Sequence, residues 1–425
     1  MVAAGSIVGA HKCEPPRRWP GDANAALVND PVFLLLHRCA DRRGFVLHCR
    51  QASAGLIVAE IQIKNLHKRF TDFTAVQNSS LVLEDGKFIV LLGPSGCGKT
   101  TTLRMIAGLE YPTSGQILLD GEDVTYKRPR ERDIAMVFQL FALYPHMGVR
   151  ANLEFPLRNE GLTRKEIDRR VSEVAGTLRI EHLLDQRVGG LAGGDRQRVA
   201  LGRAIVREPK AFLMDEPLGT LDAEFREVMC VELRKLHDRL ATTTVFVTHD
   251  QNEAMALADY IIVMNKGEIL QADDPEGIYN FPSCMFVASF IGRPAMNLLP
   301  VASGVAVGDT SLRFGSATVA IPAMRAAAEH AVLGVRPEHI DLLPAGQGVQ
   351  ARVNYCEYFG SHWVVDLESP LGTLKAVAPK DLIPVQGEAV GLRLHTERLV
   401  LFDSKSELLL ASDSTVQHRS GMRNG

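Results

Sequence analysis

The sequence predicts an α/β fold built on a parallel sheet, followed by a smaller all-β domain. Three observations lead to this prediction. The segment Gly93-Pro94-Ser95-Gly96-Cys97-Gly98-Lys99-Thr100 matches the pattern G-x-x-x-x-G-K-[ST]. Apolar runs such as residues 88–92 precede segments of helical pattern, and after Pro294 short alternating strands are separated by Gly and Pro turns. The 425 residues exceed what a single core usually organises, so more than one domain is expected.

The glycine-rich segment is typical of a loop that binds nucleotide phosphates. Residues 88–92 read as a buried strand and residues 101–109 as a helix, which is the context this motif requires. Lys99 is expected to place its charge on the β- and γ-phosphates, and the Thr100 hydroxyl is the expected magnesium ligand. Cys97, beside Lys99 at a helix start, is expected to favour the thiolate and to be sensitive to alkylation. A glycine turn that binds nothing is the alternative.

Polar side chains end three further strands. Residues 211–216 form an apolar strand that closes on Asp215 and Glu216. We expect Asp215 to hold magnesium through water and Glu216 to polarise the attacking water, because phosphoryl transfer needs both tasks. Gln139 and His249 follow two other strands, where α/β sheets present residues to ligands. The alternatives are an accidental Asp-Glu pair and a strand-end histidine without a ligand.

Between the phosphate loop and the carboxylate strand lies Leu191-Ala192-Gly193-Gly194-Asp195-Arg196-Gln197-Arg198, which resembles the LSGGQ-x-Q-R signature. The chain therefore resembles ABC transporter ATPases. The resemblance implies ATP and Mg²⁺ as cofactors and a head-to-tail dimer, in which each ATP lies between one subunit's phosphate loop and the other's signature. The implied site residues are Phe70 on adenine; Gly93, Pro94, Ser95, Gly96, Cys97, Gly98, Lys99, Thr100, Thr101 and Gln139 for ATP; Leu191, Ala192, Gly193, Gly194 and Asp195 for the opposite subunit's ATP; Leu221 and Asp222 in the D-loop; catalytic Glu216 and His249; and Thr100, Gln139 and Asp215 for the metal.

Three positions depart from the family pattern. Ala192 replaces a serine whose hydroxyl would donate to the γ-phosphate, a hydrogen bond worth roughly 1.5–3 kcal/mol. Asp195 replaces a glutamine, and its carboxylate favours the dipole of the following helix but opposes an incoming phosphate. Gly219 stands where the D-loop commonly carries serine. A working ATPase is expected, and a catalytically weakened ATP-binding or regulatory subunit is the alternative.

The chain is expected to divide into four parts. Residues 1–57 lack a periodic pattern and read as an unstructured extension; translation starting at Val58, with the upstream residues a gene-model artefact, is the hypothesis, and a real disordered tail is the alternative. Residues 58–292 form the nucleotide-binding domain, with a helical insert between Gln139 and Ala204. Residues 293–412 form a β-barrel domain, and residues 413–425 form a tail.

The second domain carries a resemblance of its own. Residues 333–339 and 357–360 resemble the OB-fold-like (TOBE) C-terminal domain of sugar importers, and residues 290–297 are similar to the junction in the maltose and glycerol-3-phosphate importer subfamily. Whether this domain binds a regulator or is a plain barrel cap is left open. The resemblance implies an ATP-hydrolysing subunit that couples ATP to uptake of a sugar or polyol-like solute, which the sequence does not identify.

Partners and location follow from the same resemblance. A homodimer or a pair with a paralogous ABC subunit is expected to work with two transmembrane permease subunits and, indirectly, a solute-binding protein, at the cytoplasmic face of the inner membrane. No apolar run approaches the roughly 18 residues of a membrane span, so membrane contact is expected through partners.

The net charge of −3 gives no strong electrostatic case for binding to nucleic acid. A soluble ATPase acting on nucleic acid or ribosomes would normally show tandem cassettes or a long coiled coil, and this chain shows neither. The seven scattered cysteines, without a C-x-x-C pair, argue against disulfides or a zinc site.

Overall fold

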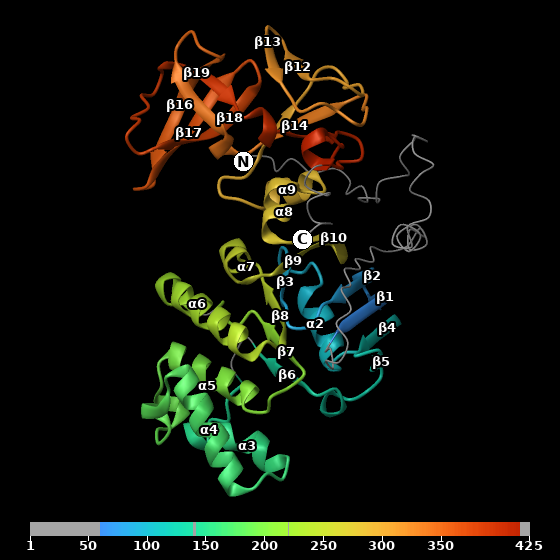
Figure 1. Ribbon diagram of the computed structural model, residues 1–425, viewed down its shortest axis with the longest axis vertical. Helices are drawn as coiled ribbons and strands as arrows, with labels where there is room; N and C mark the ends of the chain where they lie inside the picture. The colour runs from blue at the N-terminus through green and yellow to red at the C-terminus, as the bar shows by residue number, and fades with distance from the viewer. Residues whose placement is uncertain (1–59, 139–141, 220, 417–425) are drawn as a thin grey trace. The chain divides into compact units, whose positions relative to one another are not determined.

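The computed structural model describes residues 60–138, 142–219 and 221–416. The chain divides into two compact units, one ending at Pro275 and the other beginning at Glu276 (Figure 1). The predicted extension 1–57, the start at Val58, the Gln139 site and residues 417–425 of the predicted tail lie outside the described residues. The domain boundary expected at residue 292 stays a prediction, and the division between the units falls earlier in the chain.

The first unit contains an antiparallel sheet with the strand order β2-β1-β4-β5. Its strands are β1 (Ile61–Arg69), β2 (Thr74–Leu83), β4 (Ser114–Leu119) and β5 (Glu122–Asp123). Ile61 and Ile63 on β1 are buried and alternate with less buried neighbours, as expected for a sheet with one face on the core. This face packs into the same hydrophobic cluster as the central sheet and helix α2.

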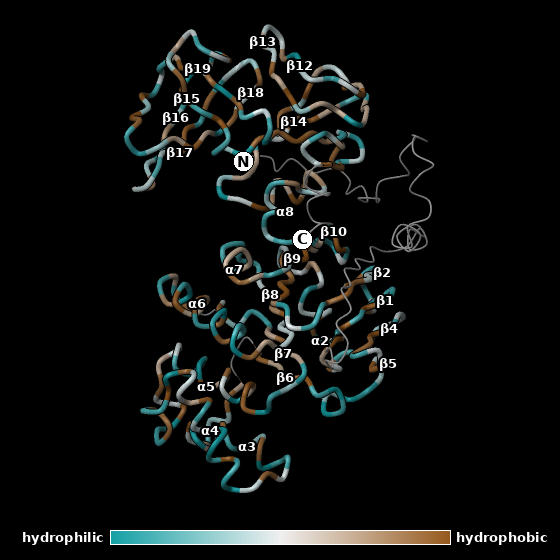
Figure 2. The backbone as a smooth tube through the Cα atoms, viewed as in Figure 1, coloured by the Kyte–Doolittle hydropathy of each residue, from teal (hydrophilic) through white to brown (hydrophobic). Residues whose placement is uncertain are grey.

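The central sheet of the first unit has the order β10-β9-β3-β8-β7-β6. Its strands are β3 (Phe88–Leu92), β6 (Ile134–Val137), β7 (Ala211–Asp215), β8 (Thr243–Thr248), β9 (Tyr260–Asn265) and β10 (Glu268–Asp273). All neighbours are parallel except β9 and β10. Strands β3, β7 and β8 are buried along their whole length, because helices and the antiparallel sheet β2-β1-β4-β5 cover both faces of the central sheet. Figure 2 shows hydrophobic colour concentrated in these central strands.

The register of the central sheet brings three strand ends to one edge. Leu92 of β3 pairs with Thr248 of β8, and Asp215 of β7 pairs with Val247 of β8. The residues that follow these strands therefore emerge side by side. The phosphate loop, Glu216 and His249 are consequently neighbours although they are far apart in sequence.

Helices accompany the central sheet, and three of them, between residues 149 and 205, form the insert expected between Gln139 and Ala204. The helices of the first unit are α2 (Lys99–Ala107), α3 (Val149–Asn159), α4 (Arg164–Leu178), α5 (Gly193–Ile205), α6 (Ala223–Leu240) and α7 (Gln251–Leu257). Three of them start on side-chain caps: Thr163 accepts from the N–H of Glu166, Asp222 from that of Phe225, and Asp250 from that of Asn252. Within the part of the chain that the structure describes, no helix combines the length and hydrophobicity needed to cross a membrane.

The second unit is dominated by antiparallel strands. It begins with two short helices, α8 (Pro275–Asn280) and α9 (Met285–Phe290). Its strands are β11 (Asn297–Pro300), β12 (Ser311–Phe314), β13 (Ala317–Ala320), β14 (Ala331–Val335), β15 (Ile340–Pro344), β16 (Val349–Tyr358), β17 (His362–Ser369), β18 (Gly372–Pro379), β19 (Ala389–Leu394) and β20 (Val400–Asp403). They form sheets of order β11-β14-β20, β12-β13 and β15-β19-β16-β17-β18. The predicted fold class, α/β followed by an all-β domain, is confirmed.

Arg336 joins the two short helices to the strands of the second unit. Its guanidinium is buried, donates to the carbonyl oxygens of Tyr279, Ala288 and Ile291, and lies 4.1 Å from the centre of the Tyr279 ring. The N–H of Met285 also donates to the carbonyl of Glu407. Residues 276–291 are therefore bonded into the C-terminal unit.

Candidate nucleotide-binding site

The phosphate loop runs from the end of β3 to the start of α2. Gly96 and Gly98 have φ angles of 77° and 107°, which only glycine adopts without strain. A Cβ at Gly93 would lie 2.2 Å from the carbonyl oxygen of Met264, so this position needs glycine for space. Ser95 and Gly96 are exposed, whereas Pro94, Thr100 and Thr101 are half-buried. The loop is thus held closely against the sheet with its tip open, as a phosphate cradle requires.

Lys99 is buried in this loop. Its ammonium donates to the carbonyls of Gly93 at 2.8 Å and of Pro94 at 2.9 Å, and its side chain is only 4% exposed. These oxygens carry no net charge, so the buried cation is suited to an anionic ligand that comes to the loop.

The neighbouring thiol behaves differently from the expectation. Cys97 is buried, with its sulfur 3.8 Å from the Lys99 ammonium. Burial raises the pKa of the Cys97 thiol, although the charge of Lys99 acts in the opposite direction. The prediction of a thiolate made reactive by the helix start was wrong, because burial outweighs the nearby charge.

Thr100 and Asp215 meet at the edge of the central sheet. The Thr100 hydroxyl, in the first turn of α2, donates to the Asp215 carboxylate at the end of β7 at 2.8 Å. Burial raises the pKa of Asp215, and the hydrogen bond from Thr100 partly offsets this. The pair offers a hydroxyl and a carboxylate oxygen side by side, which is the donor type that Mg²⁺ prefers. The third predicted metal ligand, Gln139, lies outside the described residues.

Glu216 and His249 face one another one residue beyond β7 and β8. His249 Nδ1 lies 3.4 Å from Glu216 Oε1. Glu216 has a φ of 44°, a strained conformation for a non-glycine residue, and its N–H donates to the carbonyl of Val247 at 3.0 Å. The His249 side chain is 56% exposed and that of Glu216 is 21% exposed. The backbone that carries the carboxylate is therefore held against β8, and the side chain remains accessible to water.

Phe70 follows β1 and packs against the core cluster that contains Cys97. Its ring stacks on that of Phe73 with centroids 5.3 Å apart, and the Lys68 ammonium lies 4.8 Å from its centre. Phe73 is 59% exposed. The sequence indicated only Phe70, but a second aromatic three residues later offers another flat surface beside it.

The signature-like segment lies elsewhere in the unit. Ala192 is the N-cap residue of α5 and has no side chain that could accept a hydrogen bond from the helix start, and Asp195 lies in the first turn. Leu191 is buried, and a Cβ at Gly194 would lie 2.2 Å from the ring of Phe225 on α6. Figure 1 shows α5 apart from α2, so this segment is not brought to its own phosphate loop.

The two residues expected in the D-loop, Leu221 and Asp222, immediately precede α6. Leu221 is buried, and Asp222 caps the helix through the N–H of Phe225 at 2.9 Å. Sequence reasoning missed Arg226, one turn further along α6, which bonds to the Leu221 carbonyl and to carboxylates beside His249. The sequence did contain a signal for Arg226, an arginine four residues after a capping aspartate. The same pattern is also typical of an exposed helix face.

Comparisons with known proteins agree with this arrangement. Residues 76–219 match the ABC transporter family, and residues 333–402 match the TOBE domain. The trehalose import ATP-binding protein SugC of Mycobacterium tuberculosis is 44% identical over 399 residues, covering 85% of this chain and 100% of SugC. The sn-glycerol-3-phosphate import ATP-binding protein UgpC 2 of Agrobacterium fabrum is 42% identical over 362 residues, covering 85% and 97%. The xylose/arabinose import ATP-binding protein XacJ of Haloferax volcanii is 45% identical over 369 residues, covering 82% and 95%.

The fold and the phosphate loop define a nucleotide-binding ATPase. The chain belongs to the ATP-binding proteins of ABC transporters, and its C-terminal part carries a TOBE domain.

Proposed function

We propose that this protein is the ATP-hydrolysing subunit of an importer for a sugar or polyol-like solute. The carrying observation is the convergence of Lys99, the Thr100–Asp215 pair and the Glu216–His249 pair at one edge of the central sheet. The relatives named for import of trehalose, sn-glycerol-3-phosphate and xylose or arabinose support the solute class.

The residues around the phosphate loop fit a magnesium nucleotide. Phe70 offers its ring to the adenine, and the backbone N–H groups of residues 95–101 cradle the phosphates. The buried Lys99 ammonium offsets the charge of the β- and γ-phosphates. Thr100 and Asp215 supply oxygen ligands for Mg²⁺, with Gln139 as the third, and the ion would neutralise charge on the phosphates.

Hydrolysis needs a water placed in line with the γ-phosphate. Glu216 accepts a hydrogen bond from this water and polarises it, because its carboxylate is held by a fixed backbone at the strand end. The bond from the water oxygen to phosphorus forms as the bond to the leaving ADP oxygen breaks. His249, 3.4 Å from Glu216, orients the carboxylate and contacts the γ-phosphate.

The assembly follows the family arrangement. Residues 58–292 form the nucleotide-binding domain and residues 293–412 the TOBE domain, and two copies, or one copy and a paralogous subunit, close on ATP. Leu191, Ala192, Gly193, Gly194 and Asp195 of one subunit meet the ATP of the other, and Leu221 and Asp222 line the same interface. Two permease subunits hold this dimer at the cytoplasmic face of the membrane, and a solute-binding protein delivers the solute.

The test uses the protein reconstituted with its permease subunits in liposomes. Glu216→Gln should abolish turnover and retain bound ATP, because the amide keeps the shape and loses basicity. Lys99→Ala should lose nucleotide affinity instead. Glu227→Gln, an exposed position on α6, is the matched control and should turn over like the wild type. Near-normal turnover by Glu216→Gln would contradict the role assigned to Glu216. If the reconstituted transporter takes up no sugar or polyol, the proposed solute class is contradicted.

A further inference from the structure

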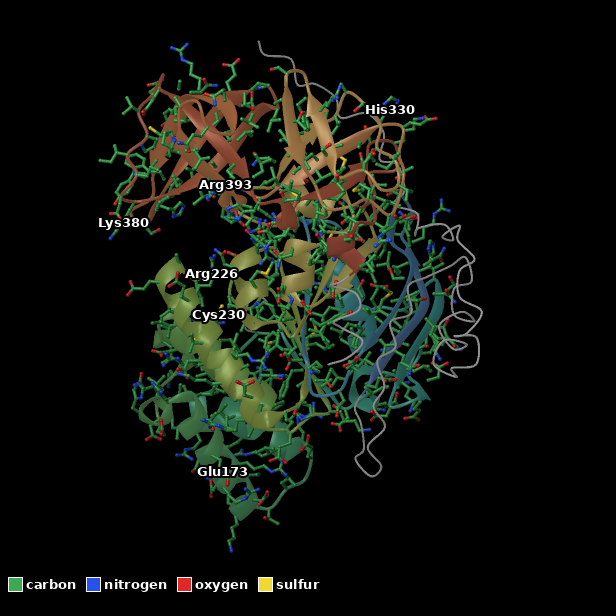
Figure 3. All side chains as sticks on the ribbon, turned by 45° about the horizontal axis from the view of Figure 1, so that its top comes forward. Glu173, Arg226, Cys230, His330, Lys380 and Arg393 are labelled. Carbon is green, nitrogen blue, oxygen red and sulfur yellow. The ribbon has the colours of Figure 1, made fainter. Side chains whose placement is uncertain are left out.

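Arg226 bonds to Asp250, the residue that follows His249 in the chain. It projects from α6 toward α7, and Figure 3 labels it with its neighbour Cys230. Its guanidinium donates to the Leu221 carbonyl at 3.0 Å and to Asp250 Oδ2 at 3.2 Å, and its Nε lies 3.4 Å from Glu253 Oε1. One cation therefore joins the start of α6 to the segment that follows β8.

The carboxylates that Arg226 contacts hold the backbone on both sides of His249. Glu253 Oε2 accepts the hydroxyl of Thr248 at 2.5 Å, and Thr248 Oγ1 accepts the N–H of Asp250 at 3.0 Å. Thr248 precedes His249 and Asp250 follows it. Asp250 also caps α7 through its other carboxylate oxygen. The backbone on both sides of His249 is thus held by a ring of contacts, made of hydrogen bonds and of the Arg226–Glu253 ion pair.

These contacts depend on the balance between the charge of Arg226 and that of the buried Glu253 carboxylate. Glu253 is only 4% exposed, and burial raises its pKa. The Thr248 hydroxyl lowers this pKa, the nearby charge of Asp250 raises it, and the charges of Arg226 and His249 lower it. Without a cation, a buried carboxylate is strongly unfavourable and tends to take up a proton or move toward water. Either response would loosen Thr248 and with it His249.

We infer that Arg226 is a positioning residue that keeps His249 against Glu216 during ATP hydrolysis. It acts through Thr248 and Asp250 and anchors them to the Leu221 carbonyl at the start of the D-loop helix. This inference rests on the proposed function, since it concerns the same reaction.

Arg234 provides a matched control on the same helix. It also bonds to α7 and its surroundings, donating to the Leu257 carbonyl at 3.0 Å and pairing with Asp259 at 3.0 Å and Asp238 at 2.8 Å. Leu257 and Asp259 lie at the end of α7 that is opposite to His249, and Asp238 lies on α6 itself. Loss of Arg234 removes a comparable set of bonds without touching Thr248 or Asp250.

The experiment compares Arg226→Met, Arg226→Lys and Arg234→Met in the reconstituted transporter. Arg226→Met should lower kcat at least about tenfold with ATP affinity, measured with a fluorescent ATP analogue, within about twofold. Arg226→Lys keeps the charge and should recover part of kcat, although one ammonium cannot reach all three oxygens. Arg234→Met should change kcat by less than about threefold even where the melting temperature falls equally.

A double-variant cycle separates positioning from general weakening. In a His249→Ala background, Arg226→Met should cause no further loss of kcat, because the residue it positions is gone. A further loss of the full size, or equal kcat for the Arg226 and Arg234 variants, would overturn the inference. If Arg226→Met does not fold, Arg226→Lys in both backgrounds decides the same question. Wild-type protein without turnover would contradict the proposed function instead.

Discussion

The hydroxyl of Thr100 donates to the carboxylate of Asp215 across 2.8 Å, joining the first turn of α2 to the end of β7. Two of the three proposed metal ligands thus lie within hydrogen-bond distance of one another. Since the hydroxyl donates to a carboxylate whose pKa burial raises, this contact partly compensates a charge that the fold alone disfavours.

Asp215→Asn should separate the metal role from the structural one. The amide oxygen can still accept from Thr100, so the hydrogen bond survives while the charge is lost. A raised folded-state pKa means that the ionised form costs stability above the unfolded pKa, so the variant should be at least as heat-stable as the wild type near neutral pH. ATP binding in a metal chelator should be unchanged and turnover with Mg²⁺ lost. A marked fall in melting temperature would show that the charge holds the fold.

Restoring a hydroxyl at the start of α5 should strengthen both the helix and the closed dimer. Ala192 is the N-cap residue without a side-chain bond, so Ala192→Ser should add about 1 kcal/mol of stability and raise the melting temperature by roughly 2–4 °C. Turnover should rise by roughly tenfold if the hydroxyl also donates to the partner's γ-phosphate. Ala192→Thr and Ala192→Val form an isosteric pair, and only threonine should reproduce the gain. Asp195→Gln is measured separately, because the carboxylate also favours its own helix start. If Ala192→Ser and the wild type have the same melting temperature and turnover, the alanine at this position is tolerated variation.

Gly194→Ala should disturb the approach of α5 to α6. The added methyl carbon would lie 2.2 Å from the Phe225 ring, so the ring or the helix must shift, at a cost of about 1–3 kcal/mol. Phe225→Leu removes the obstructing ring edge, and the double variant should recover stability relative to Gly194→Ala alone. Thermal unfolding of the four proteins measures this coupling. Strictly additive losses would argue against the contact.

His237 should make stability depend on pH. It is buried on α6, with Nδ1 3.1 Å from the Thr244 hydroxyl, and burial lowers its pKa below the ordinary value of about 6.5. The unfolded chain then takes up the proton first, so stability is present above about pH 6.5 and is lost as pH falls toward the lower folded pKa. His237→Asn should flatten the fall in melting temperature between about pH 7.5 and 5.5. His182→Asn, at an exposed position, should leave the slope intact.

The strands that carry the site were predictable because parallel strands buried on both faces read as continuous apolar runs. Phe88–Leu92 and Ala211–Asp215 are of this kind, and the polar residue that ends such a run marks the ligand edge. The family resemblance added the order of the motifs. Gln139 remains a prediction, because it lies outside the described residues.

The remaining features depend on distances that a sequence pattern does not contain. Arg226 and Glu253 look like residues of solvated helix faces, and only the packing of α6 against α7 pairs a half-buried arginine with a buried glutamate. The Cys97 expectation was wrong for a similar reason, since the charge beside it was visible in sequence and its burial was not. The requirement for glycine at position 194 likewise follows from the contact of α5 with the Phe225 ring on α6.

The buried guanidinium of Arg336 determines where the chain can be cut. A C-terminal fragment that begins at residue 293 would keep Arg336 but lose the carbonyls of Tyr279, Ala288 and Ile291, so the guanidinium would lose these three acceptors. A fragment that begins at Glu276 keeps them all. Autonomous folding of the all-β part therefore requires residues that precede its first strand, and the two short helices serve as the base of that unit.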